Sequence, residues 1–225
     1  SDPEVIHEFA NIVGDEKHLD HLYLLTVADV RATNPKMWNN WKAQLFQETY
    51  ELAKRALRQG LETPVDKEEL LKEKQQQTLT LMQASEATAE QARTLWHAFG
   101  DDYLLRCRPE EIVWHTELLA DLTDLPVQLT VDVREAPTTG GTEVMVHASQ
   151  GQFTFAIATG VLDEFGLSIA DARIIPLKNQ QSLSIYTILE QNGQPVTEES
   201  RRKKIQLRLL SALKENDDNP VLITR

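Results

Sequence analysis

The sequence lacks several features that would place it in particular classes of protein. It contains one cysteine, Cys107, so no disulfide can form within the chain, and this scarcity favours a reducing cytoplasm. No apolar run approaches the roughly 18 residues that a membrane-spanning helix needs, and no signal peptide is visible. Positive charge is in deficit, since the formal net charge is −12, which argues against nucleic acids and anionic membranes as partners. The first residue is not methionine, and we expect the chain to be a piece of a longer protein.

The first quarter of the chain predicts helices with clear ends. The chain has 225 residues, of which 41% are hydrophobic and 26% charged, values typical of a soluble protein with one or two domains. Asp2 and Pro3 suit a helix start, and Gly14 suits its end. Asp15 can cap a second helix, which Asn34-Pro35 would stop while starting a third. In that third helix we expect one packing stripe, formed by Met37, Trp38, Trp41, Leu45 and Leu52.

One carboxylate in the second helix does not match its surroundings. In "LLTVADVRATNP", helical spacing places Asp29 on the same face as Leu22, Leu25 and Thr26, and this apolar face is expected to turn inward. A buried carboxylate needs compensation. The residues leave two possibilities open: hydroxyls such as those of Thr26 or Thr33, or an arginine, satisfy Asp29, or it binds a metal ion.

Residues 63–125 predict further helices of more polar character. "DKEELLKEKQQQTLTLM" suits a largely solvated connecting helix. "RPEEIVWHTELLADL" suits a helix that starts at Pro109, with His115 as a half-buried structural residue. Cys107 has no evident base beside it and is expected to be inert. His18 and His21 lie one turn apart, and we interpret them as exposed polar residues.

After Pro126 the hydrophobic pattern changes from the helical period to a period of two. "VQLTVDV", "TEVMVHA", "LSIADARII" and "SLSIYTILE" predict strands, and helices are predicted at about 153–165 and from "VTEESRRKK" onward. The order β-α-β-β-α is most of a ferredoxin-like unit, and a final strand could begin at "VLITR". The predicted class is therefore α+β, an all-helical segment followed by a ferredoxin-like unit. The residues expected in the core of that unit are Val144, Val146, Ile157, Val161, Ile205 and Leu209.

Two stretches resemble one family. "LYLLTVADVRATNPKMWNNWKAQLF" is similar to the closing segment of the HD domain in the bifunctional uridylyltransferase/uridylyl-removing enzymes of the PII signalling protein. "HASQGQFTFAIATGVLDEFGLSIADARIIP" is similar to the first of the two ACT domains of these enzymes, and "RPEEIVWH" fits the helices between them. The resemblance implies an HD segment at 1–62, a helical connector at 63–126 and an ACT domain at 127–225, whose final strand the chain could cut short.

The resemblance also implies a role for Asp29. It matches the last aspartate of the HD metal site, which would hold a divalent metal, Mg or Mn, in the longer enzyme. The chain contains no His-Asp dipeptide, so the other ligands are expected upstream. We therefore expect this segment to be catalytically inactive and to bind no metal tightly.

The ACT resemblance points to a ligand site in the turn formed by Ser149, Gln150, Gly151, Gln152 and Phe153. The aspartate and glycine usual in this turn are replaced by Ser149 and Gln152, so the anionic anchor for a ligand ammonium group is missing. Asp171 could substitute if it faces the same cleft. We expect glutamine to bind weakly or not at all.

The function implied by the resemblance is a regulatory segment of a cytoplasmic enzyme that controls nitrogen assimilation in response to glutamine. The longer enzyme would transfer UMP to PII and remove it by hydrolysis. PII and glutamine are the expected partners, nucleic acid and membranes are not, and ACT domains could form a homo-oligomer. The alternative is a stand-alone amino-acid sensor or assembly module of the ACT type, without enzymatic function.

Overall fold

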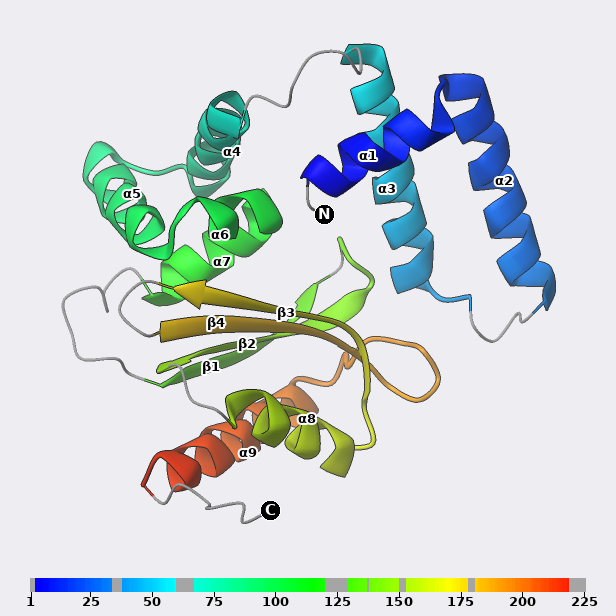
Figure 1. The fold of residues 1–225 in the computed structure, drawn as a ribbon. Helices are drawn as coiled ribbons and strands as arrows, with labels where there is room; N and C mark the ends of the chain where they lie inside the picture. The colour runs from blue at the N-terminus through cyan, green and yellow to red at the C-terminus, as the bar shows by residue number, and fades with distance from the viewer. Residues whose placement is uncertain are drawn as a thin grey trace, which may run out of the picture. The chain divides into compact units, whose positions relative to one another are not determined.

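The computed structural model describes residues 3–33, 38–59, 67–119, 129–136, 138–149, 153–177 and 181–218. The chain divides into two compact units, residues 1–123 and 124–225. The first unit is helical and the second contains a four-stranded sheet with two helices (Figure 1). This confirms the α+β class. Among the described residues, no helix has the length and hydropathy needed to cross a membrane.

The first three helices are α1 (Pro3–Val13), α2 (Glu16–Thr33) and α3 (Asn40–Gln59). The predicted boundary between α1 and α2 is confirmed. Gly14 has a φ of +86°, a left-handed conformation that favours glycine and ends α1. The Asp15 carboxylate accepts a hydrogen bond from the backbone N–H of His18 at 2.9 Å and so caps α2.

The third helix differs from the prediction. The expected start at Asn34-Pro35 lies outside the described residues, and α3 begins at Asn40, where the Asn39 side chain accepts the N–H of Lys42 at 2.9 Å. The predicted packing stripe is wrong for Leu45, which is exposed, and for Trp38, which precedes the helix, whereas Trp41 and Leu52 are partly buried on α3. Met37 lies outside the described residues. A different face of α3 packs against α1 and α2, and the cluster there comprises Ala10, Leu19, Ala53 and the flanking Phe9, Val13, Tyr50, Ala56 and Leu57.

Four more helices follow: α4 (Lys67–Met82), α5 (Glu86–Phe99), α6 (Asp101–Arg106) and α7 (Pro109–Leu119). The predicted start of α7 at Pro109 is confirmed. Glu111, fully buried, accepts hydrogen bonds from the backbone N–H of Arg108 at 2.7 Å and from its guanidinium at 2.8 Å. His115 is structural, as predicted, but it is fully buried, and its Nδ1 lies 3.1 Å from the Tyr103 hydroxyl. Cys107 is buried and reduced.

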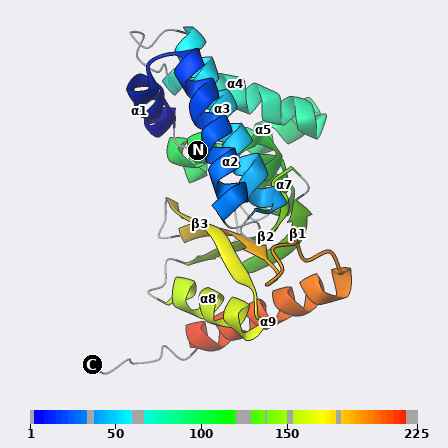
Figure 2. The ribbon, with the colours of Figure 1, turned by 90° about the vertical axis from the view of Figure 1, so that its right-hand side faces the viewer.

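The second unit contains β1 (Thr130–Ala136), β2 (Gly141–Ser149), α8 (Thr154–Glu164), β3 (Ser168–Leu177), β4 (Gln181–Leu189) and α9 (Glu199–Asp218). The strands are antiparallel and lie in the order β1-β2-β4-β3. In both ribbon views α8 and α9 lie side by side on one face of this sheet (Figure 2).

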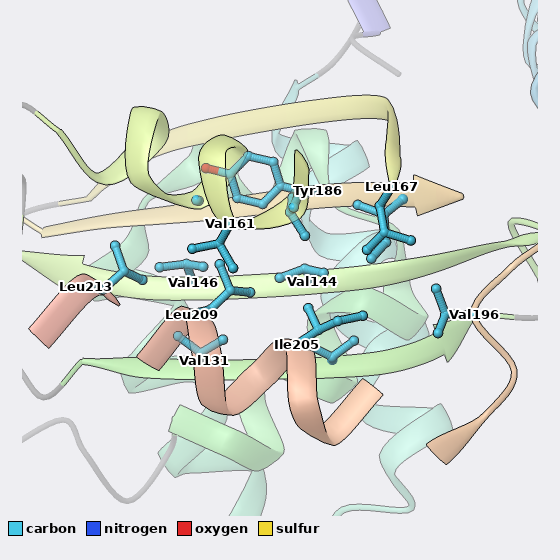
Figure 3. Packing of buried hydrophobic residues seen from close by; sticks show 14 of the residues in the cluster. Val131, Val144, Val146, Val161, Leu167, Tyr186, Val196, Ile205, Leu209 and Leu213 are labelled. Carbon is cyan, nitrogen blue, oxygen red and sulfur yellow. The ribbon is translucent and has the colours of Figure 1, made fainter. Parts of the chain in front are cut away.

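The core of the second unit lies between the sheet and the two helices (Figure 3). Alternate residues of β2 and β4 point toward the helices, as the period of two predicts. Five of the six expected core residues are buried and Ile157 is partly buried, so the prediction is confirmed. The buried five are Val144, Val146, Val161, Ile205 and Leu209.

The sheet differs from a ferredoxin-like unit in the origin of one edge strand. In the order of a β-α-β-β-α-β unit, the last strand of the chain pairs beside the first. Here β1, which comes before the unit, pairs with β2 from Thr130↔His147 to Ala136↔Gly141 and takes that place. β2 thus has a partner on each side. The predicted final strand at "VLITR" lies outside the described residues.

Candidate functional site

Asp29 lies in the last part of α2 and is exposed, together with Leu22 and Leu25 on the same face. Leu25 is 68% exposed. The prediction that this face turns inward is therefore wrong for the part of the chain that the structure describes. The hydrophobic pattern indicates which residues share a face, but burial also requires a surface that packs against that face, and no described element covers it.

The contacts of Asp29 are few. The Thr33 hydroxyl donates to Asp29 Oδ1 at 3.3 Å, whereas the Thr26 hydroxyl donates to the Leu22 carbonyl oxygen at 2.7 Å. Within the described ranges, no cation forms an ion pair with Asp29. Of the residues proposed to satisfy Asp29, only Thr33 contacts it, and a neutral hydroxyl leaves the negative charge in place.

The chemistry of Asp29 suits one position in a metal site. Carboxylate oxygens are ligands that Mg²⁺ and Mn²⁺ prefer. The described residues contain no group of three or more histidine, cysteine, aspartate or glutamate side chains that could hold a metal ion. Asp29 therefore fits as a single ligand whose co-ligands must come from residues other than these.

His18 and His21 are exposed, as predicted. The Nδ1 atom of His18 lies 2.6 Å from Asp15 Oδ2, at the beginning of α2. The hydrogen bond from the His18 backbone N–H is the main reason that the pKa of Asp15 falls below its usual value. This arrangement stabilises the start of a helix and brings no further ligand to Asp29.

A polar network that the sequence analysis missed holds α2 against α3. The Tyr50 hydroxyl donates to Asp20 Oδ1 at 2.6 Å, and Lys54 Nζ lies 3.4 Å from the same oxygen. Arg58 binds both carboxylate oxygens of Glu16, at 3.1 and 3.0 Å. The Tyr50 hydrogen bond is the main cause of the lowered pKa of Asp20. The spacing of four residues, between 16 and 20 and between 50, 54 and 58, is the signal that could have revealed it.

The turn expected to bind an amino acid lies between β2 and α8. Ser149 is exposed at the end of β2, and Phe153, which precedes α8, is partly buried and provides no side-chain cap for that helix. Gln150, Gly151 and Gln152 lie outside the described residues. The structure therefore describes the two ends of this turn.

Asp171 does not lie near this turn within one chain. Ser149 and Leu177 both pair with Gln181, whereas Asp171 pairs with Thr187, six residues farther along β4. At about 3.3 Å per residue, the two places are roughly 20 Å apart. Asp171 also shares the sheet face of Thr187, opposite to the helices, and its Oδ2 lies 3.3 Å from Nε of Arg173. The condition that Asp171 faces the same cleft is not met.

Comparisons with known proteins extend these observations. Residues 66–118, which span α4 to α7 except the last residue of α7, match the family model described as "Uridylyltransferase GlnD fifth domain". The whole chain is 40% identical to segments of the bifunctional uridylyltransferase/uridylyl-removing enzymes of Ectopseudomonas mendocina, Pseudomonas aeruginosa and Pseudomonas syringae pv. tomato. The resemblance to the bifunctional uridylyltransferase/uridylyl-removing enzymes is confirmed over the full chain.

The matched enzymes are much longer than this chain. The chain is covered completely, but it spans about a quarter (25%) of each of these relatives. No solved structure gives a significant match. Because the fifth-domain model begins at residue 66, helices α1 to α3 correspond to a part of these enzymes that precedes their fifth domain.

Proposed function

We propose that the chain is a regulatory segment of a bifunctional enzyme that attaches UMP to the PII signalling protein and removes it, in response to glutamine. Residues 1–62 are the end of its HD phosphohydrolase domain, 63–126 a helical connector and 127–225 an ACT domain. The observation that carries this proposal is the 40% identity over the whole chain to a quarter of such enzymes. By itself the segment is expected to be inactive, since the resemblance assigns it one ligand of the hydrolytic site, Asp29.

In this proposal, Asp29 is the last protein ligand of the divalent metal, Mg²⁺ or Mn²⁺. The metal, when bound, supplies activation of a water molecule for cleavage of the phosphodiester. Two features support the assignment: Asp29 has no cation partner among the described residues, and apolar side chains near it on α2 are exposed. These are Leu22, Leu24 and Leu25, and grouped exposed apolar residues are typical of a surface that packs against other polypeptide.

The test is Asp29→Asn in the longer enzyme, with uridylyl transfer and uridylyl removal measured in the same preparation. Removal should fall at least about 100-fold, since weakening even an outer partner of a metal ligand costs 10–100-fold. Transfer should stay within about twofold, because it uses another domain. Asp15→Asn is the matched control, because asparagine also caps helices and leaves both activities intact. An equal loss of both activities, with an intact circular-dichroism spectrum, would instead show that Asp29 is structural.

The sheet unit, in the same proposal, senses glutamine as one half of a site. The turn between β2 and α8 places a helix N-terminus where it can receive a carboxylate. Since Asp171 is too distant to hold the ammonium group, this chain should bind glutamine only at about 1 mM or weaker, equivalent to about 4 kcal/mol. Calorimetry on this chain decides the matter: micromolar binding would contradict the proposal.

A second candidate function is an assembly module of the ACT type, which one feature of the sheet favours. Among the described residues β3 pairs with β4 alone, and Ile169 and Ile174 are exposed on this edge strand. An edge strand presents backbone groups with which a further strand can pair. Self-association in sedimentation velocity, lost in Ile174→Lys, would support this function; a monomer at all concentrations would exclude it for this chain.

A further inference from the structure

Helices α1 to α7 of the first unit form two groups, α1 to α3 and α4 to α7, each with buried contacts of its own. The apolar cluster described above for the first group draws all its members from α1 to α3. In the second group α4 packs against α6 and α7, and the buried Trp96 side chain on α5 donates to the Thr116 hydroxyl on α7 at 2.9 Å. Each group therefore has contacts that can keep it folded when the other group moves.

Charged side chains join the two groups. Ion pairs cross this junction at three places among the described residues, with charged atoms 2.6, 3.2 and 3.8 Å apart: Lys67–Glu4, Arg55–Glu73 and Arg108–Glu48. These side chains are 25–66% exposed, so water and salt reach them. The first group contributes two negative charges and one positive charge, and the second group contributes the opposite signs, which favours one orientation of the two groups.

The side of α3 that takes part in this junction differs from the side that binds α2. Glu48 and Arg55 lie seven residues apart, about two turns of helix, and so share one face. Tyr50, Lys54 and Arg58 follow each other at intervals of four residues and bind the carboxylates of α2. Changes in the junction can therefore leave the attachment of α2 to α3 intact.

Exposed ion pairs stabilise a structure only slightly, and salt weakens them further. The range of charge interactions falls from about 10 Å at 0.1 M salt to about 3 Å at 1 M. Polar interfaces between parts of one chain commonly permit relative motion. We propose that the junction between α1–α3 and α4–α7 is closed by these ion pairs and opens, with both groups still folded, when the charges are screened or reversed.

The junction lies at a boundary that the family comparison also marks. The fifth-domain model begins at residue 66, directly before α4. With α1 to α3 at the end of the hydrolytic domain, as proposed above, opening of the junction changes the attachment of the fifth domain to that domain. This regulatory consequence rests on the proposed function, whereas the opening itself does not.

The test measures the distance between the two groups in this chain by pulsed electron paramagnetic resonance. Spin labels are attached at Lys17→Cys on α2 and Glu90→Cys on α5, both exposed positions, while the native Cys107 is 1% exposed and stays unlabelled. The fraction of molecules outside the main distance should rise by about two- to fivefold between 0.1 M and 1 M NaCl.

Charge reversal at the junction gives the matched comparison. Arg55→Glu should raise the same fraction at low salt, and Arg55→Glu combined with Glu73→Arg should restore the distance of the parent. Arg208→Glu is the control, because it reverses the same charge in an exposed ion pair with Glu164, at 3.1 Å, within the sheet unit. It should leave the distance unchanged.

A distance distribution that is the same in the parent at both salt concentrations and in Arg55→Glu overturns the proposal. An equal change in Arg208→Glu overturns it too, as does a double reversal that fails to restore the distance. If Arg55→Glu lowers the melting temperature, the salt comparison in the parent decides alone. None of these results bears on uridylyl removal, so the proposed function is tested separately.

Discussion

Helices α2 and α9 have similar lengths, but their apolar side chains have opposite surroundings. In α9, Ile205 and Leu209 are fully buried against the sheet, and Leu207 is the large apolar residue left exposed. In α2, Leu19 is buried, whereas Leu24 and Leu25 are 63% and 68% exposed. Apolar residues at helical spacing are therefore buried in α9 but largely exposed in α2.

This difference concerns how far the apolar side chains of each group of helices are packed among the described residues. The sheet and its two helices close one core within residues 129–218. The first three helices share a smaller cluster around Ala10, Leu19 and Ala53 and leave further apolar residues, such as Ile12, on the surface. This exposure is consistent with the proposal that α1 to α3 belong to a larger domain.

The largest expected effect comes from the same substitution made in the two helices. Leu209→Ala should destabilise the sheet unit by about 2–5 kcal/mol, because it opens a cavity in a closed core. Leu25→Ala should change stability by less than about 0.5 kcal/mol in this chain, because the side chain is already in water. All four tryptophans, at 38, 41, 96 and 114, lie in the first unit, so their fluorescence reports that unit. Circular dichroism reports both units, so a transition seen in circular dichroism but not in fluorescence belongs to the sheet unit. Equal costs in the two helices would refute the comparison.

A smaller effect is expected where the loop before α9 is attached to β2. The buried Thr142 hydroxyl accepts the Val196 N–H at 2.7 Å and donates to the Val196 carbonyl oxygen at 3.4 Å. Thr142→Val should cost about 1–3 kcal/mol in urea denaturation, because it leaves a buried N–H without its acceptor. Thr142→Ser keeps the oxygen and serves as the control. If valine and serine behave alike, the hydrogen bond is not what stabilises this loop.

A third effect depends on pH and should appear in the sheet unit. Burial lowers the pKa of His147 below its usual 6.5, although a hydrogen bond with Gln181 opposes the shift. The unfolded chain then binds a proton more readily than the folded one, so the contribution is present above about pH 6.5 and is lost as the pH falls below it. His147→Gln should therefore lose less stability than the parent between pH 7 and 5. A steeper loss in the variant would contradict the lowered pKa.

The sequence predicted most of the sheet unit because its signals are local. Strands with a period of two, turns with glycine and a helix with Ile205 and Leu209 on one face are consistent with each other. It could not predict that β1 fills the last strand's place, since pairing order depends on contacts distant in sequence. The same limit applies to Asp29. The residues that share its helix face were identified correctly, but burial of that face depends on contacts with segments distant in sequence, which a local pattern does not encode.

Among the site predictions too, the one that depends on local spacing was correct and the one that depends on distant pairing was wrong. Thr33 was recognised as one possible partner of Asp29 because spacing by one helical turn determines their proximity. Asp171 was placed near the turn after β2 on the basis of its strand alone, and the register shows that it pairs near the other end of β4. For Thr33 and Asp171 alike, the residue type indicated suitable chemistry. Helical spacing was enough to place Thr33 beside Asp29, whereas the distance of Asp171 from the turn depends on strand register.

Hydrogen exchange tests the central claim, that α1 to α3 belong to a larger domain, most directly. Amide protection should be compared between this chain and the longer enzyme, since local stability follows the contacts that cover each element. The account predicts that β2 and β4 are equally protected in both, whereas amides of α2 around Leu24 and Leu25 are protected at least about 10-fold more in the longer enzyme. Equal protection of α2 in the two proteins would contradict it.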